Sequence, residues 1–448
     1  MRHQNFDLVI CGAGVSGLYA AWRLSANKAL KIAVVESNPQ IGGRILSLAL
    51  ESPDNFIELG AMRHQSNQAH IQKLIKILNL KTVPVPELEK QYFALRENQI
   101  TSVEKMKWGQ GYHLAPDFRD KDPNQILKLI DSKHPNPLGL GYHDLLASVL
   151  PAEALKLCID ADGYDSNFRN SNATEGFQYH QRHNDPKLQS RRFFPNNEEL
   201  PKSLLKNTGK QVQILLNHSV KKVSQEPSGF RVHLSTVDSK ETILQCQQII
   251  SSIPPGALLQ VELPANLQSA VTKLSANLIT EQASKIVFVY TDCWWQSLNI
   301  ESGRLISDGP LRNILFSKRG RENCITIYNE QPLAKFTSDQ KIIEFLKPQL
   351  DKILKLESPI PDRIEKKCWQ SSSSRSAYHS WQANTDVEKL SELALQPLNS
   401  QSFFMCGEAF SRQQSWMEGA IESTDRMLVK HFHMKALLDD LSQESLSV

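Results

Sequence analysis

The sequence predicts an α/β fold joined to an α+β part, in which one parallel sheet is assembled from separate stretches of the chain. Three observations lead to this prediction. A strand of the buried type, a glycine-rich turn and a helix follow one another over residues 7–24. Strands that suit the same sheet return over 200–257 and 398–435. The stretch of about 111–195 is richer in Tyr, His, Asn, Asp and Pro and shows short helical patterns, which indicates a helical insertion.

The first stretch has the pattern of a dinucleotide-binding turn. The apolar run Asp7–Cys11 suits a buried parallel strand, and glycines follow it in the spacing G-x-G-x-x-G at Gly12, Gly14 and Gly17. The first glycine allows a tight turn, the second lets backbone N–H groups approach a pyrophosphate, and the third lets the helix pack closely on the sheet. The positive end of that helix then faces the phosphates, so we predict a Rossmann-like domain. The remaining residues of this turn are Ala13, Val15 and Ser16.

Glu36 supports the same interpretation. It ends a second apolar strand pattern, Lys31–Glu36, about 20 residues after the third glycine, where an acceptor for ribose hydroxyl groups is expected. An acid at this position disfavours a 2′-phosphate and therefore NADP. The alternative is a solvated strand end.

Two further motifs follow in the first part of the chain. The step Gly42-Gly43-Arg44 suits a backbone that passes close to a ligand, with Arg44 available to neutralise a phosphate. The alternating run 56–64 predicts a strand that leads into a turn, with Arg63 at its exit.

Two more motifs lie in the second half. Lys285 opens the apolar strand 284–290 and shares a face with its valines, and a solvated edge is the alternative reading of this lysine. A strand over 401–408 ends in a glycine and an acid, and a helix begins near Trp416, so a second helix N-terminus is available to a ligand.

Composition excludes several classes of function. The formal net charge is +3, from 51 Lys+Arg against 48 Asp+Glu, which is too small and too evenly spread for nucleic-acid binding. There is no apolar run of 18 residues and no apolar signal region at the start, so we expect no membrane partner. The seven cysteines lack C-x-x-C spacing, which predicts no metal centre, and their odd number fits a reducing compartment. These features predict a cytoplasmic protein.

Taken in order, these motifs resemble those of the FAD-dependent amine oxidase family. The resemblance extends from the glycine turn at 12–17 to the helix start at 416–420, and six motifs in a fixed order are far more specific than any one of them. Within the family the chain is most similar to the L-amino-acid oxidases, and closest to their bacterial branch. The passages that carry this closer similarity are 57–61, 294–295, 310–312 and 416–419.

The resemblance implies three domains and a cofactor. The domains are a discontinuous FAD-binding domain, a mixed-sheet substrate-binding domain and a helical domain. FAD would be held without a covalent bond, because Ala377 stands where covalent members carry a cysteine. The family also suggests a homodimer. The expected bounds are 1–65, 200–257 and 398–435 for the FAD-binding domain, 66–110 and 258–397 for the substrate-binding domain, and 111–199 for the helical domain.

The resemblance also implies roles for single residues. Arg63 matches the arginine that holds the α-carboxylate of the substrate, for which a guanidinium fork is well suited, and a structural salt bridge is the alternative. Lys285 matches the lysine that holds a water against flavin N5, where burial would lower its proton affinity. Further candidates for the substrate wall, each of which could instead belong to the core or its surroundings, are His64, Tyr378, Trp381 and Trp416. The cofactor contacts implied beyond the glycine turn and Glu36 are Gly42, Gly43, Arg44, Gly60, Ala61, Met62, Arg63, Val220, Gly407, Glu408, Trp416 and Met417.

These roles predict an L-amino-acid oxidase. The amino acid would bind through its carboxylate on Arg63 with its amine neutral, transfer a hydride from Cα to flavin N5, and leave as an imino acid that hydrolyses to a 2-oxo acid and ammonia. Dioxygen would reoxidise the flavin and yield hydrogen peroxide. One alternative is an oxidase of monoamines or polyamines, in which Arg63 would have no evident role. Another is a binding module on the same fold without redox activity, against which Lys285 and the 416–420 motif argue.

Overall fold

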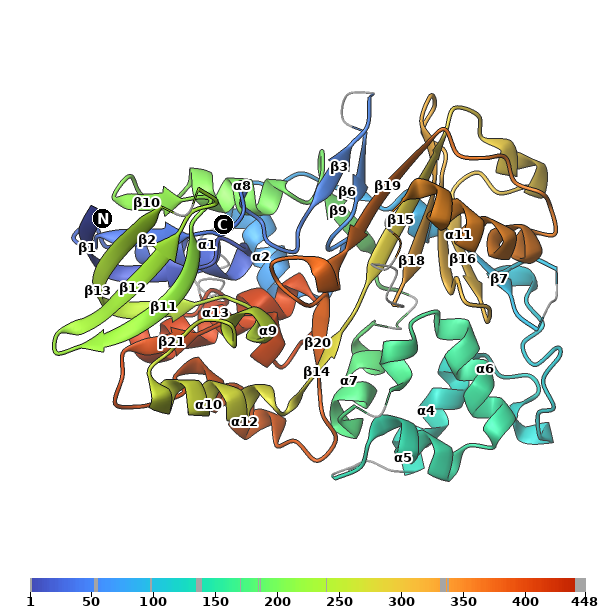
Figure 1. Ribbon diagram of the computed structural model, residues 1–448. Helices are drawn as coiled ribbons and strands as arrows, with labels where there is room; N and C mark the ends of the chain where they lie inside the picture. Colours follow the sequence, from blue (N-terminus) through green and yellow to red (C-terminus); the bar gives the residue numbers. More distant parts are fainter. Residues whose placement is uncertain are drawn as a thin grey trace, which may run out of the picture.

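The computed structural model describes residues 2–51, 55–96, 99–133, 139–169, 171–183, 185, 187–238, 240–330, 336 and 338–439. Figure 1 shows a lobe on the left that contains the first strand, and on the right a second sheet with a group of helices below it. The strands labelled β14 and β20 lie between the two lobes in this view.

The left lobe is built on a seven-stranded sheet that carries the glycine turn. Its strand order is β10-β2-β1-β13-β12-β11, with β21 paired to β13. The pairs among β10, β2, β1, β13 and β21 are parallel, whereas β12 and β11 are antiparallel additions. Strands from three separate stretches of the chain therefore share one sheet. The strands are β1 (Arg2–Cys11), β2 (Ile32–Val35), β10 (Val212–Leu215), β11 (Ser219–Glu226), β12 (Gly229–Ser235), β13 (Glu241–Ser251) and β21 (Phe403–Met405).

Helices cover both faces of this sheet, because successive strand residues point to opposite sides. Leu8 and Ile10 pack in one cluster with α1, α2, α8 and α13, whereas Val9 and Cys11 pack in another with α9, α10 and α12. The helices of the first cluster are α1 (Val15–Leu24), α2 (Ala69–Ile77), α8 (Glu199–Lys206) and α13 (Met417–Phe432). Those of the second are α9 (Pro255–Leu258), α10 (Ala265–Ser275) and α12 (Val387–Leu395).

The right lobe contains a second seven-stranded sheet, in the order β19-β15-β18-β17-β16-β7-β8. Its pairs are antiparallel except for β16 with β7. Helix α11 (Asp339–Leu354) packs on it through Ile342, Leu346 and Leu350. The strands are β7 (Gln91–Ala94), β8 (Thr101–Ser102), β15 (Ser284–Tyr290), β16 (Gly303–Ser307), β17 (Asn313–Ser317), β18 (Asn323–Asn329) and β19 (Arg363–Cys368).

A helical group lies beneath the second sheet in Figure 1. It contains α4 (Pro123–Lys133), α5 (Tyr142–Val149), α6 (Ala152–Asp162) and α7 (Ala173–His183). The expected helical range of 111–199 also includes β9 (Ser190–Phe193), which pairs with β5 (His64–Gln65) and β6 (Thr82–Pro84) in a small sheet of its own. The remaining short elements are β3 (Ser47–Ala49), β4 (Phe56–Glu58), α3 (Pro86–Glu89), β14 (Leu278–Glu281), β20 (Tyr378–Trp381), and the single turns at Val103–Lys105, Pro116–Phe118, Asp165–Phe168, Trp294–Leu298, Trp369–Ser371 and Glu408–Phe410.

Candidate active site

A cavity of about 730 Å³ brings together most of the residues singled out from the sequence. Its wall comes from both sheets, from the start of α13 and from the helical group. The expected residues that line it are Gly12, Gly14, Val15, Ser16, Glu36, Gly42, Gly43, Arg44, Gly60, Ala61, Met62, Arg63, Val220, Lys285, Tyr378, Gly407, Glu408, Trp416 and Met417.

The glycine turn has the geometry of a cradle for an anion. Gly12 has a φ of +107°, and a Cβ at Gly17 would lie 2.0 Å from the carbonyl oxygen of Gly12, so both positions require glycine. A Cβ at Gly14 would meet no atom within 4 Å, although this residue lines the cavity. Helix α1 begins here without a side-chain cap, which leaves its first N–H groups available to a phosphate.

Glu36 lies at the end of β2 and lines the cavity. Its Oε2 accepts a hydrogen bond from the backbone N–H of Ala13 at 2.9 Å, and its Oε1 accepts from the backbone N–H of Asn38 at 2.9 Å. Ala13 itself does not line the cavity in the described structure. It therefore contributes by holding the glycine turn against Glu36.

Arg44 and Glu408 form an ion pair at the cavity wall, in which Glu408 is buried and Arg44 is partly exposed. Nη1 of Arg44 donates to Oε2 of Glu408 at 2.8 Å and to the carbonyl oxygen of Ala377 at 3.0 Å. Glu408 also accepts hydrogen bonds from the backbone N–H groups of His379 and Ser415. Burial alone would raise the pKa of the Glu408 carboxyl, but Arg44 and His379 lower it to about 2. The pair therefore stays ionised and fixes the backbone next to Gly407.

Lys285 is buried at the start of β15. Its Nζ donates to the carbonyl oxygens of Glu58 at 2.7 Å and Gly60 at 2.8 Å, and it lies 5.0 Å from the ring centroid of Tyr328. An ammonium group has three donors, so one remains for the cavity. Burial lowers the pKa of Lys285 to about 8, the charge of Glu58 opposes this shift, and the charge of Arg63 adds to it.

Arg63 places a guanidinium at the cavity, where no described residue supplies a counter-charge. It makes no hydrogen bond or ion pair with the described part of the chain, and its Nε is buried without a partner. Its Cζ lies 5.4 Å from the ring centroid of Trp416, a distance typical of a cation–π contact. A structural salt bridge, the alternative considered from the sequence, is therefore not formed with any described residue.

The helical group supplies wall residues that sequence reasoning missed. Tyr164, Asn167 and Tyr179 line the cavity, and His183 stacks on Trp416 with ring centroids 4.4 Å apart and planes 14° apart. Burial and the charges of Arg182 and Arg63 lower the pKa of His183 to about 3. No motif marks these residues. Another wall residue, Tyr328, lies directly opposite Lys285 across β15 and β18, and this register becomes visible only in the structure.

Two of the expected wall residues do not reach the cavity. His64 is buried against Phe193, with ring centroids 4.9 Å apart, and Trp381 donates from Nε1 to the carbonyl oxygen of Ser411 at 3.1 Å. For Trp381 the reason is strand alternation. On β20, Trp381 lies an odd number of residues from Tyr378, so these two side chains point to opposite faces of the strand. His64 is the first residue of β5, directly after Arg63, and its ring packs on Phe193 instead of entering the cavity.

The chain is similar to known proteins in family, sequence and fold. The family model for flavin-containing amine oxidoreductases matches residues 15–426. The chain belongs to this family. An L-amino-acid oxidase from Mus musculus is 27% identical over 78% of this chain and 56% of its own length. A flavin-containing amine oxidase A from Equus caballus is 22% identical over 95% of this chain and 85% of its own.

A solved structure of wild-type putrescine oxidase bound to putrescine superposes with a TM-score of 0.75 at 16% identity, over 96% of this chain and 100% of that chain. This likeness, together with the family match, confirms the predicted amine oxidase fold and the FAD cofactor. The protein is thus an FAD-dependent oxidoreductase of amines that uses dioxygen. Within the described residues, no helix combines the length and apolar composition of a membrane span, and no three metal-ligating side chains gather as a metal site would require.

FAD fits the residues that line the cavity. Two helices, α1 and α13, present their N-termini there without side-chain caps, which suits the phosphates and an electron-rich carbonyl of the cofactor. Gly14 faces the cavity with space for a close approach, and Glu36 offers a carboxylate. Ala377 lines the cavity with a side chain that cannot form a covalent link to the flavin.

The substitution Gly14→Ala is expected to weaken FAD binding without unfolding the protein. Gly14 has a φ of −71°, which alanine can also adopt, so the backbone would not be strained. The added methyl group would instead project into the space that a pyrophosphate needs. We expect the Kd for FAD to rise about tenfold. Titration of apoprotein with FAD, followed by fluorescence quenching, measures this, and an unchanged Kd would contradict the assignment of the turn. Gly256→Ala, at a glycine outside the cavity wall, is the matched control.

Proposed function

We propose that this protein is an L-amino-acid oxidase. It would convert an L-amino acid to the 2-imino acid, which water hydrolyses to the 2-oxo acid and ammonia, while dioxygen is reduced to hydrogen peroxide. The observation that carries the proposal is the guanidinium of Arg63, which lines the cavity and has no anionic partner among the described residues. A bidentate ion pair with an α-carboxylate would supply that partner.

The charges on the cavity wall support a substrate with a carboxylate over a diamine. The carboxylates among the described lining residues are Glu36 and Glu408, and both are already hydrogen-bonded within the protein. Lys285 and Arg63 give a positive charge to the end of the cavity where the substrate would bind. A second ammonium group on the substrate would therefore meet positive charge and find no free anionic partner there.

The protein's own residues would do three things in the reaction. Arg63 would hold the carboxylate, which fixes the position of Cα. Trp416 would close one side of the substrate, and Lys285 would direct its remaining donor into the cavity. Bound FAD supplies the two-electron acceptor that dioxygen reoxidises. No side-chain base is required if the amine arrives neutral, so activity should rise with pH as the substrate amine deprotonates.

Hydrogen peroxide release from a panel of L-amino acids, D-amino acids and simple amines tests the proposal. We expect selective peroxide release from a subset of L-amino acids, at least about tenfold above their D-enantiomers and the corresponding amines without a carboxylate. Putrescine or tyramine as the best substrate would instead establish an oxidase of amines. Purified protein without bound flavin and without peroxide release would favour a binding module.

A further inference from the structure

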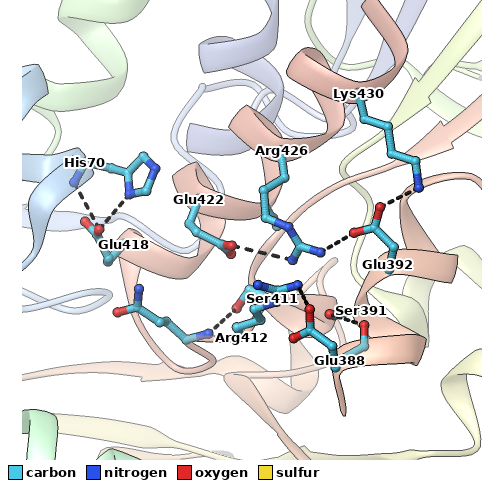
Figure 2. A network of polar contacts seen from close by, with 12 residues as sticks. His70, Glu388, Ser391, Glu392, Ser411, Arg412, Glu418, Glu422, Arg426 and Lys430 are labelled. Carbon is cyan, nitrogen blue, oxygen red and sulfur yellow. Dashed lines mark hydrogen bonds and ion pairs between the residues drawn. The ribbon is translucent and has the colours of Figure 1, made fainter. Parts of the chain in front are cut away.

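Glu418, the second residue of α13, makes contacts that its own helix does not require. Its side chain is 2% exposed. Its carboxylate accepts a hydrogen bond from the backbone N–H of His70 at 3.0 Å (Figure 2). It accepts a second from the backbone N–H of Ile71, also at 3.0 Å. Nδ1 of His70 lies 2.8 Å from the same carboxylate, and because an ionised carboxylate only accepts, this nitrogen carries the proton.

These N–H groups belong to the first turn of another helix, α2. The N-cap residue of α2, Gln68, makes no side-chain cap hydrogen bond. The first N–H groups of a helix lack partners within the helix, and a carboxylate is a favourable acceptor at that positive end. Glu418 therefore caps α2 from α13. Burial lowers the pKa of His70, but the hydrogen bond and charge of Glu418 raise it more, so the pKa lies above its usual value.

The two helices that Glu418 joins each follow a residue of the proposed substrate site. Trp416 immediately precedes α13 and lines the cavity, and Arg63 shortly precedes α2. The segment between Arg63 and α2 is held to that helix, because the backbone N–H of Gln65 donates to Oε1 of Gln68 at 3.1 Å, and the carbonyl oxygen of Gln65 accepts from Gln72. A shift of α2 against α13 would therefore move Arg63 relative to Trp416.

We propose that Glu418 is a positioning residue: by capping α2 from α13, it holds the guanidinium of Arg63 and the indole of Trp416 at the separation that binds the substrate carboxylate. The inference rests on the proposed function, since it assigns Glu418 to the geometry of the carboxylate site. Glu418 lies outside the cavity wall in the described structure, so it acts through Arg63 and not on the substrate.

The substitution Glu418→Gln tests this inference. Glutamine keeps the shape, but its amide nitrogen donates, so it cannot accept all three hydrogen bonds. We expect the Kd of benzoate, a carboxylate that the enzyme cannot oxidise, to rise about tenfold when followed by the absorbance of the bound flavin. The KM of the best L-amino acid should rise by the same factor, with kcat changed less than about twofold. Glu392→Gln is the matched control, because Glu392 lies in the same network (Figure 2), accepts from Arg426 and Lys430, and does not contact α2.

A double-mutant cycle separates positioning from a general loss of structure. In an Arg63→Ala background, Glu418→Gln should cause no further rise in the Kd of benzoate, because the group that it positions is gone. A tenfold loss that persists in that background, or a Kd within about twofold of wild type in the single variant, would overturn the inference. If Glu418→Gln does not fold, His70→Ala removes only the side-chain hydrogen bond and should raise the Kd about threefold, and an unchanged Kd would overturn the inference equally.

The wild-type protein and the Arg63→Ala variant show first whether the proposed function itself fails. In that case L-amino acids would release no peroxide, and Arg63→Ala would leave benzoate binding unchanged. Both results are obtained without any change at Glu418.

Discussion

Arg63→Ala is expected to raise the KM for L-amino acids about 100-fold. The guanidinium has no partner among the described residues, so its removal leaves no buried carboxylate of the protein uncompensated. The loss falls on the bound substrate, whose carboxylate would be left unpaired in a site of low exposure, at a cost of about 3 kcal/mol. Steady-state kinetics with peroxide detection over a range of substrate concentrations measures this effect.

Arg63→Lys refines the same experiment. Lysine keeps the positive charge but loses the bidentate fork, so we expect a KM increase of about tenfold, intermediate between wild type and alanine. Oxidation of an amine without a carboxylate is the internal control, since its rate should not fall in either variant. If both variants bind L-amino acids as tightly as wild type, the carboxylate does not bind at Arg63.

Lys285→Met is expected to lower kcat/KM for dioxygen about 100-fold. The buried ammonium makes two hydrogen bonds to backbone carbonyls and keeps one donor for the cavity. Under the proposed function, this donor would stabilise the negative charge that develops on dioxygen as it is reduced. Removal of one fixed donor or charge from such a site costs about 100-fold in rate. The rate of flavin reoxidation, measured by stopped-flow mixing of reduced enzyme with oxygen, isolates this step. An unchanged reoxidation rate with slower amino acid oxidation would instead place Lys285 in the first half-reaction.

The rates of the two half-reactions, oxidation of the amino acid and reoxidation of the flavin by dioxygen, should change with pH in opposite directions. Because burial lowers the pKa of Lys285 to about 8, its positive charge is present below that pH and is lost as the pH rises through it. The oxygen reaction of the wild-type enzyme should therefore slow above about pH 8, whereas amino acid oxidation should quicken as the substrate amine deprotonates. In Lys285→Met the oxygen reaction should lose its dependence on pH in this range.

Much of the cofactor end could be predicted because its signals are local. The glycine turn, Glu36 and Arg44 each depend on short runs of residues whose backbone requirements are visible in the chain. The turn is found with the expected positive φ at Gly12 and the close approach at Gly17. The strand of Lys285 by itself also allowed a solvated edge, and only the resemblance to the family implied that this lysine is buried, as the structure shows it to be.

The substrate end could be predicted only in part, because it depends on strand faces and on helix packing. His64 and Trp381 were expected at the wall but do not line it. Trp381 points away because it lies on the opposite face of β20 from Tyr378, and His64 packs on Phe193. Tyr179 reaches the cavity, and His183 stacks behind the wall residue Trp416, only because α7 packs beside the loop before α13.

The sequence by itself determined that this protein binds a dinucleotide cofactor on a discontinuous parallel sheet. It could do so because the strand, the glycine turn and the helix that bind such a cofactor follow one another directly in the chain. Only the tertiary structure decided that Arg63 lacks an anionic partner among the described residues, and that Glu418 reaches across to α2. Both facts concern residues far apart in the chain. Their contacts arise from how helices and sheets pack, and no local pattern of residues encodes such packing.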